Sequence, residues 1–214
     1  ANVSHELKTP MTTIGGYVDG ILDGTISKDN EKHYLQIVSS EVRRLSRLVR
    51  SMLDLSRLQA QGIDESRKTR FDLGDVMSDV LITFEQKINA RGLQVSVDLP
   101  EKPVWTKADR DAITQVVYNL LDNAIKFCPV GGNLGLILEQ DGQKARLRIR
   151  NTGQTIPPEE LPLLFDRFHK ADKARSADRE GWGLGLYIAK TIIGAHGGEI
   201  WATSENGVTE FTFT

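Results

Sequence analysis

The sequence predicts two domains: an all-α helical hairpin that forms a dimeric four-helix bundle, followed by an α+β sandwich. Three observations support this fold class. Apolar residues recur every three or four positions as far as about Leu58, a polar stretch follows, and helical and alternating patterns are mixed from Phe71 onward. We expect the hairpin in residues 1–62, a linker in 63–70 and the sandwich in 71–214.

The hairpin is predicted from two apolar stripes. The first stripe steps by three or four positions through Val3, Leu7, Met11, Ile14, Val18 and Ile21. Asp23-Gly24-Thr25 interrupts it, and Ser27 can cap a second helix that runs to about Leu58. The second stripe has heptad-like spacing and contains Leu35, Val38, Val42, Leu45, Val49 and Met52.

A single hairpin would bury these two stripes poorly. We therefore expect two copies of the chain to pair as a four-helix bundle, which makes the protein a homodimer. The alternative is that the second half of the chain covers the seam.

The second half of the chain predicts alternating helices and strands. The expected helices are 73–90, 109–127 and 184–196. The expected strands are 71–73, 93–97, 133–139, 144–150, 199–203 and 209–214. Elements in this order favour one sheet with helices on one of its faces.

The composition of the chain argues against several kinds of site and partner. The chain has 27 basic and 29 acidic residues and a net charge of -2, so nucleic acid is not an expected partner. Cys128 is the only cysteine, which excludes an internal disulfide and a cysteine-rich zinc site. No apolar run reaches the roughly 18 residues of a membrane span. The chain opens without an initiator methionine, so we expect an excerpt of a longer protein.

The first unusual motif is Ser4-His5-Glu6-Leu7-Lys8-Thr9-Pro10, on the first predicted helix. His5, Glu6 and Thr9 are polar, and Pro10 removes a helix hydrogen bond and bends the axis. Such a stretch packs poorly, which favours a functional surface. An ordinary alternative exists for Thr9, whose hydroxyl can instead cap the bend before the proline.

Three further motifs lie in the second half. Asn119, Asn123 and Lys126 share one helix face, where amide oxygens suit Mg²⁺ and a lysine suits phosphate, although a solvated face is the ordinary alternative. Asn151-Thr152-Gly153 follows a strand. The run Gly181-Trp182-Gly183-Leu184-Gly185 leads into a helix, where glycines let the backbone approach phosphate. It follows a charged loop, which excludes a Rossmann motif.

In this order, with Phe165-Asp166-Arg167-Phe168 between the two glycine segments, the motifs resemble those of a bacterial two-component sensor histidine kinase. The resemblance covers essentially the whole chain. The first half resembles the dimerisation and phosphoacceptor domain. The second half resembles the ATP-binding domain shared in outline with gyrase, the heat-shock chaperone ATPases and the MutL mismatch-repair proteins.

The resemblance implies roles for the residues of the first motif. His5 would attack the γ-phosphate of ATP and become phosphohistidine, and Glu6 would accept or hold the proton of the other ring nitrogen. Thr9 would orient a water molecule when the kinase dephosphorylates its response regulator. The phosphoryl group would pass to an aspartate of the receiver domain of that regulator. The face around Thr13, Tyr17 and Gly20 would dock it.

The resemblance also implies an ATP and Mg²⁺ site. Asn123 would bind Mg²⁺ with Asn119 close by, Lys126 would meet phosphate, and Phe127 would lie near the nucleotide. The ATP lid would include Lys173 and Arg175, whose positive charges could contact phosphate. It would end in the second glycine segment, with Gly181, Gly183, Leu184 and Gly185. The parent protein would be a membrane-anchored sensor, with this fragment on the cytoplasmic side.

Two positions depart from the family pattern in the first glycine segment. Asn151 stands where the family has an aspartate that accepts from the adenine amino group, Gly153 is kept, and Thr155 replaces the second glycine. Loss of the charge-assisted hydrogen bond is expected to weaken ATP binding by about 1 kcal/mol. The alternative function is a non-catalytic or phosphatase-only dimeric scaffold with a degenerate ATP pocket. A clamp ATPase is disfavoured, because the hairpin precedes the ATP domain and no transducer domain follows.

Overall fold

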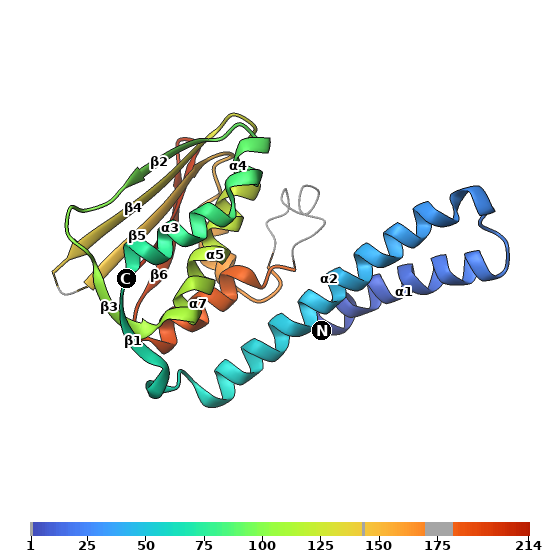
Figure 1. Ribbon diagram of the computed structural model, residues 1–214, viewed down its shortest axis with the longest axis horizontal. Helices are drawn as coiled ribbons and strands as arrows, with labels where there is room; N and C mark the ends of the chain where they lie inside the picture. The colour runs from blue at the N-terminus through green and yellow to red at the C-terminus, as the bar shows by residue number, and fades with distance from the viewer. Residues whose placement is uncertain (1, 143, 170–181) are drawn as a thin grey trace. The chain divides into compact units, whose positions relative to one another are not determined.

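The computed structural model describes residues 2–142, 144–169 and 182–214 (Figure 1). The chain divides into two compact units, one formed mainly by the first 57 residues and the other mainly by the residues from Leu58 onward. The first unit is helical and the second combines helices with two sheets. Within the described residues, no helix is both long and apolar enough to cross a membrane.

The first unit is the predicted helical hairpin. Helix α1 spans Asn2–Leu22, and α2 spans Lys28–Gln61, three residues beyond its predicted end. The connection is fixed by a hydrogen bond of 2.8 Å from the Ile26 N–H to the Gly20 carbonyl. Asp23 accepts a further bond from the Thr25 N–H at 2.9 Å. The turn is therefore held by local polar contacts, as expected between two antiparallel helices.

The second unit contains two sheets. A two-stranded antiparallel sheet pairs β1, Lys68–Asp72, with β3, Trp105–Asp109. A five-stranded sheet has the order β2-β4-β5-β7-β6. Its strands are β2 Gln94–Asp98, β4 Asn133–Asp141, β5 Lys144–Thr152, β6 Ile200–Glu205 and β7 Val208–Phe213. Only β2 and β4 pair in parallel, and the other neighbours in this sheet are antiparallel.

The helices of this unit lie on one face of the larger sheet (Figure 1). Among the described residues, these helices are α3 Leu73–Thr83, α4 Glu85–Ala90, α5 Arg110–Phe127 and α7 Gly185–Ala195. The same part of the chain also has two short 3₁₀ helices, η1 Glu65–Arg67 and η2 Leu161–Phe165. Alternate sheet residues such as Leu136 and Ile149 are buried toward the helices, and Val117 and Leu121 of α5 are fully buried. This alternation confirms the predicted α+β class.

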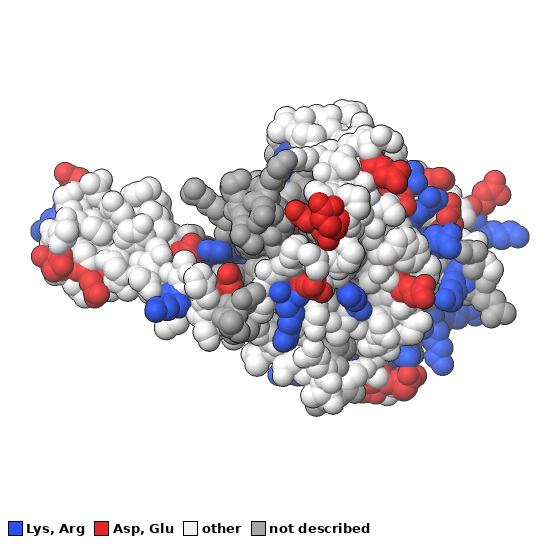
Figure 2. Space-filling view, turned by 180° about the vertical axis from the view of Figure 1, so that it is seen from behind, with Lys and Arg blue, Asp and Glu red and all other residues white. Residues whose placement is uncertain are grey.

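Charges on the opposite face of the sheet are paired. Arg148 forms an ion pair with Glu139, and Arg150 forms one with Glu210. Figure 2 shows basic and acidic side chains interspersed on the face that it views, without a large field of one sign.

Three details of the predicted fold were wrong. The helix expected over 73–90 is broken at Phe84, a residue 1% exposed, whose N–H bonds to the Leu81 carbonyl and tightens the end of α3. Strand β1 begins at Lys68, inside the predicted linker. Phe71 is the only buried side chain of that strand, so the residues before it carry no apolar pattern that would have predicted a strand. Strand β3 was not predicted at all, and it gives the unit its second sheet.

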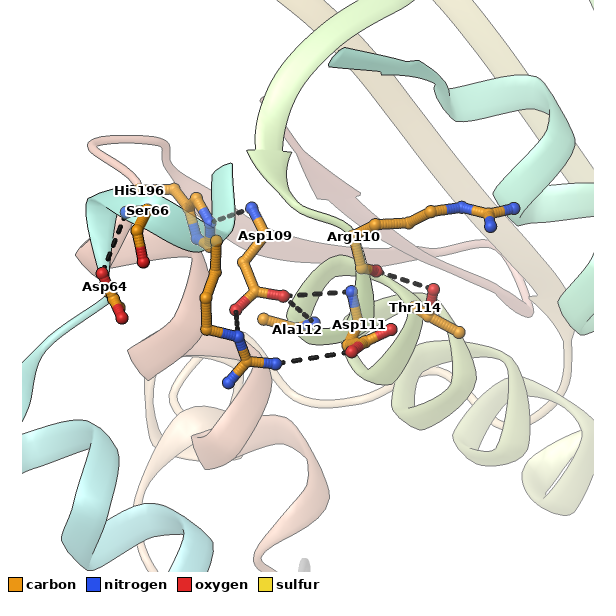
Figure 3. A network of polar contacts seen from close by, with 9 residues as sticks. Asp64, Ser66, Asp109, Arg110, Asp111, Ala112, Thr114 and His196 are labelled. Atoms are coloured by element: carbon orange, nitrogen blue, oxygen red, sulfur yellow. Dashed lines mark hydrogen bonds and ion pairs between the residues drawn. The ribbon is translucent and has the colours of Figure 1, made fainter. Parts of the chain in front are cut away.

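A polar network joins η1, the start of α5 and the end of α7 (Figure 3). The buried Asp109 carboxylate accepts from the N–H groups of Asp111 and Ala112 at 3.1 and 3.2 Å and caps α5. Arg67 reaches the same carboxylate at 3.2 Å. His196 accepts from the Asp109 N–H at 3.1 Å through Nε2, and its Nδ1 donates to a carbonyl of α7. The network therefore anchors the segment that enters this unit to two of its helices.

The η1 turn that carries Arg67 is itself ordered by a side-chain cap. Asp64 accepts from the Ser66 N–H at 2.9 Å. Hydrogen bonding from Ser66 holds the pKa of the exposed Asp64 carboxyl below its usual value. The charged carboxylate is thus the form that caps η1.

Replacing Asp109 with alanine is expected to lower the free energy of unfolding of this unit by about 2–3 kcal/mol. The change removes a helix cap and leaves Arg67 without its buried partner. Asp111→Ala is the matched control, because the Asp111 side chain is 89% exposed and its pair with Arg67 is expected to contribute less than about 0.5 kcal/mol. Urea unfolding of the three proteins measures both effects. Equal losses in the two variants would contradict the assigned role of Asp109.

Candidate functional site

The imidazole of His5 stands open on the surface of α1. Its side chain is 80% exposed, and that of the neighbouring Glu6 is 32% exposed. His5 Nδ1 lies 4.0 Å from Glu6 Oε1, which is longer than a hydrogen bond but close enough for a small rotation to form one. A ring in this position is accessible to a reactant, with a carboxylate beside the ring nitrogen nearer to the helix.

Thr9 uses its hydroxyl within the helix. Thr9 Oγ1 donates to the His5 carbonyl at 3.2 Å, and one turn later Thr13 Oγ1 donates to the Thr9 carbonyl at 3.1 Å. Pro10 is buried and has no N–H, so it cannot donate to the Glu6 carbonyl one turn before it. The geometry of Thr9 therefore fits the bend-capping alternative, while its exposed hydroxyl leaves the water-orienting role as a prediction.

Asn119, Asn123 and Lys126 lie half-buried on α5, as the sequence predicts for one helix face. The Asn119 amide donates to the Gly185 carbonyl at 3.1 Å, which links α5 to the first residue of α7. Lys126 Nζ lies 5.3 Å from the centroid of the Phe127 ring. Two of the sequence motifs therefore meet at this helix: the asparagine segment, which contains Asn119, Asn123 and Lys126, and the second glycine segment, which contains Gly185.

The first glycine segment also meets α5. Asn151 is the residue before the last of β5, with 3% of its surface exposed, and its amide donates to the Thr152 carbonyl at 3.0 Å. A Cβ on Gly153 would lie 3.0 Å from the Phe127 carbonyl oxygen, a close contact that would need its neighbours to move by a few tenths of an ångström. The loop and the end of α5 therefore meet at Gly153.

The second glycine segment has a strict backbone requirement at Gly183. Its φ is +66°, and an added Cβ would lie 2.6 Å from the His169 carbonyl oxygen. The Gly183 carbonyl accepts from the Phe168 N–H at 3.0 Å. Leu184 is only 4% exposed, so its side chain belongs to the core. Lys173, Arg175 and Gly181 lie outside the described residues.

Gly183→Ala is expected to lower the free energy of unfolding of this unit by about 2 kcal/mol or more, because the new methyl group adds both a positive-φ strain and a clash. Gly185→Ala is the control, because there a Cβ would lie 3.6 Å from the nearest Asn119 atom, an ordinary contact. Thermal unfolding of both variants gives the comparison. A Gly183→Ala protein as stable as the control would contradict this account.

Sequence reasoning missed a set of polar contacts that hold the first glycine segment. The Ile156 N–H donates to Ser204 Oγ at 2.9 Å, and Ser204 Oγ lies 2.9 Å from Thr209 Oγ1. Ser204 and Thr209 come from β6 and β7 and are buried. Both strands of this hairpin were predicted, and the Asn206-Gly207 dipeptide between them is a turn signal that could also have predicted how they pair.

The chain matches two family models in the expected order. Residues 1–61 match the His Kinase A (phospho-acceptor) domain, and residues 108–214 match the histidine kinase-, DNA gyrase B- and HSP90-like ATPase. The sensor protein SrrB of Staphylococcus aureus is 38% identical over 208 residues, which are 97% of this chain and 35% of SrrB. The chain therefore spans about a third of the length of the curated relatives it matches.

Two solved structures are similar along the whole chain. The histidine kinase AdeS of Acinetobacter baumannii is 31% identical, with a TM-score of 0.79 over 98% of this chain and 95% of that chain. The histidine kinase ThkA, solved in complex with the response regulator protein TrrA, is 28% identical, with a TM-score of 0.78 over 100% of this chain and 59% of that chain. The chain belongs to the sensor histidine kinases, protein-histidine kinases that join a phospho-acceptor domain to an ATPase domain.

Proposed function

We propose that this chain autophosphorylates on His5 with ATP and then passes the phosphoryl group to an aspartate of a response regulator. The observation that carries the proposal is the meeting of the asparagine segment with both glycine segments at α5, in a chain whose first helix exposes His5. The same hairpin would serve the reverse reaction, dephosphorylation of the regulator, in which Thr9 would orient the attacking water.

The chemistry at His5 is a phosphoryl transfer from oxygen to nitrogen. A neutral ring nitrogen attacks the γ-phosphorus of ATP, the N–P bond forms, and the bond to the β–γ bridging oxygen breaks to release ADP. Glu6 Oε1 lies nearer to Nδ1, which makes Nε2 the attacking atom and Nδ1–H the proton that Glu6 holds or accepts. Reaction through Nε2 also suits an exposed ring, because this nitrogen lies farther from the helix.

The nucleotide phosphates would bind along α5 and the start of α7. Asn123 offers an amide oxygen to Mg²⁺ and Lys126 offers a positive charge, while no side chain in the described residues caps the N-terminus of α7. Among those residues, no group of three His, Cys, Asp or Glu side chains could hold a metal by itself. Mg²⁺ held by Asn123 would supply charge neutralisation for the transfer.

The orientation of the Asn151 amide supports retained adenine recognition. Its nitrogen donates to the Thr152 carbonyl at 3.0 Å, which leaves the amide oxygen as the acceptor for an adenine amino group. Asparagine thus keeps the hydrogen-bonding polarity of the aspartate that the family has at this position, and loses only its charge. This argues for the kinase over the scaffold with a degenerate pocket.

We propose a homodimer that pairs through the hairpin and meets a response regulator on α1. Leu35, Val42 and Val49 are seven positions apart on α2 and are 51%, 47% and 43% exposed, which leaves a heptad seam for a second copy to bury. Tyr17, whose ring lies 4.9 Å from that of Tyr34, belongs to the proposed regulator-docking face. The similar histidine kinase ThkA was solved in complex with the response regulator protein TrrA. The parent protein would be a membrane-anchored sensor, with this core on the cytoplasmic side.

The experiment that tests the proposal is incubation of the chain with Mg²⁺ and γ-labelled ATP. Retained label that is labile in acid and stable in alkali is expected, because phosphohistidine has this stability. α-Labelled ATP and chelation of Mg²⁺ are the controls, and neither should give retained label. A folded dimer that binds no ATP would favour the scaffold, and steady hydrolysis without a phosphoprotein would favour a clamp ATPase.

A further inference from the structure

We infer that Thr155, which stands where the family pattern has glycine, is a positioning residue. It holds the proposed nucleotide-binding loop, which follows β5 and includes residues 153–156, on the turn between β6 and β7. The inference rests on the proposed function, because it concerns how that site binds ATP. From the sequence alone, Thr155 is only a departure from the family pattern, at the position of the second glycine.

The loop and the turn are joined by a reciprocal pair of hydrogen bonds. The Gly153 N–H donates to the Gly207 carbonyl at 2.8 Å, and the Gly207 N–H donates to Thr155 Oγ1 at 2.9 Å. Both polar groups of Gly207 are therefore used by the loop. Glycine at position 155 would remove the second of these bonds, because it has no side-chain acceptor.

The turn that receives the loop is a tight hairpin turn between two paired strands. Residues Glu205 and Val208 are paired partners, so Asn206 and Gly207 form a two-residue hairpin turn. Their φ values are +50° and +75°, as the favoured type of such a turn requires. The following N–H of the loop, at Ile156, is held by the buried Ser204 of the same hairpin at 2.9 Å. Three hydrogen bonds, at Gly153, Thr155 and Ile156, therefore hold the loop to this hairpin.

This anchoring bears directly on the nucleotide site. Gly153, one of the anchored residues, lies against the end of α5, and Asn151 precedes it by two residues. A loop that is already ordered loses less conformational freedom when ATP binds. Removing the Thr155 acceptor should therefore weaken ATP binding without changing the phosphoryl transfer step.

The test compares Thr155→Val, Thr155→Gly and Thr155→Ser with the wild type, measuring the rate of His5 labelling against ATP concentration. Valine and glycine should each raise KM for ATP about fivefold with kcat within about twofold, while serine keeps the acceptor and should restore the wild-type KM. Gln154→Val is the matched control, because Gln154 is a neighbouring exposed residue of the same loop. Thr155 is itself exposed, so unfolding midpoints are expected to stay unchanged.

Three results would overturn the inference: an unchanged KM in Thr155→Val, a lower KM in Thr155→Gly, or failure of serine to restore the wild-type value. Direct ATP titration of the wild type separates this from failure of the proposed function. A wild type that neither binds ATP nor gains label overturns both. A wild type that does both, beside variants with unchanged KM, overturns only the role of Thr155.

Discussion

His5→Gln is expected to abolish retained phosphate completely while leaving ATP binding unchanged. Glutamine keeps the length and polarity of the side chain but has no nitrogen basic enough to attack phosphorus. His5 is 80% exposed and lies in a different compact unit from α5, so its replacement should disturb neither folding nor the nucleotide pocket. Labelling with γ-labelled ATP and titration with ATP measure the two halves of this prediction.

His33→Gln is the matched control, because His33 is also an exposed histidine of the hairpin. It should retain the label of the wild type. Acid-labile label that survives in His5→Gln would show that another residue is the phosphoacceptor. Loss of label in both variants would indicate damage to the hairpin instead of removal of the nucleophile.

Asn123→Ala is expected to slow autophosphorylation on the order of 100-fold or more, because it removes the amide oxygen proposed to bind Mg²⁺. Asp122→Ala is the control on the neighbouring position. Its carboxylate pairs with Lys87 at 2.9 Å and is 41% exposed, so its loss should change the rate by no more than a few-fold. Raising the Mg²⁺ concentration should partly rescue Asn123→Ala if the lost group is a metal ligand. Equal rates in the two variants would exclude this role.

Mixing these variants also reports the direction of transfer in the proposed dimer. A His5→Gln protomer keeps its ATP site, and an Asn123→Ala protomer keeps its acceptor histidine. Label on the mixture, absent from each variant alone, would show transfer between protomers. Absence of label from mixed dimers would show transfer within one protomer.

The sequence predicted most of what depends on local pattern. The hairpin followed from apolar residues such as Leu35, Val42 and Val49, whose spacing encodes both the helix and its seam. The shared face of Asn119 and Asn123 followed from helix geometry alone. These features need only neighbours within a few turns, so single-sequence reasoning could reach them.

What the sequence did not predict depends on distant partners. Strand β3 was missed because Trp105 is 52% exposed and the strand has little alternation, and its pairing with β1 lies more than 30 residues away. The role of Thr155 was missed for the same reason, since its partner Gly207 is 52 residues further along the chain. In both cases the pairing is set by tertiary structure, which overrides local preference.

The geometry at Gly183 bears on how activity can be lost as such chains diverge. Gly183 is constrained by its φ and by the His169 carbonyl, so its replacement is expected to destabilise this unit whether or not ATP binds. A descendant that had given up catalysis would be expected to keep Gly183 and to tolerate change at Asn123 and Gly185. Retention of that glycine is therefore a sign of the fold, whereas replacement of Asn123, the proposed Mg²⁺ ligand, would be expected in a relative that has lost kinase activity.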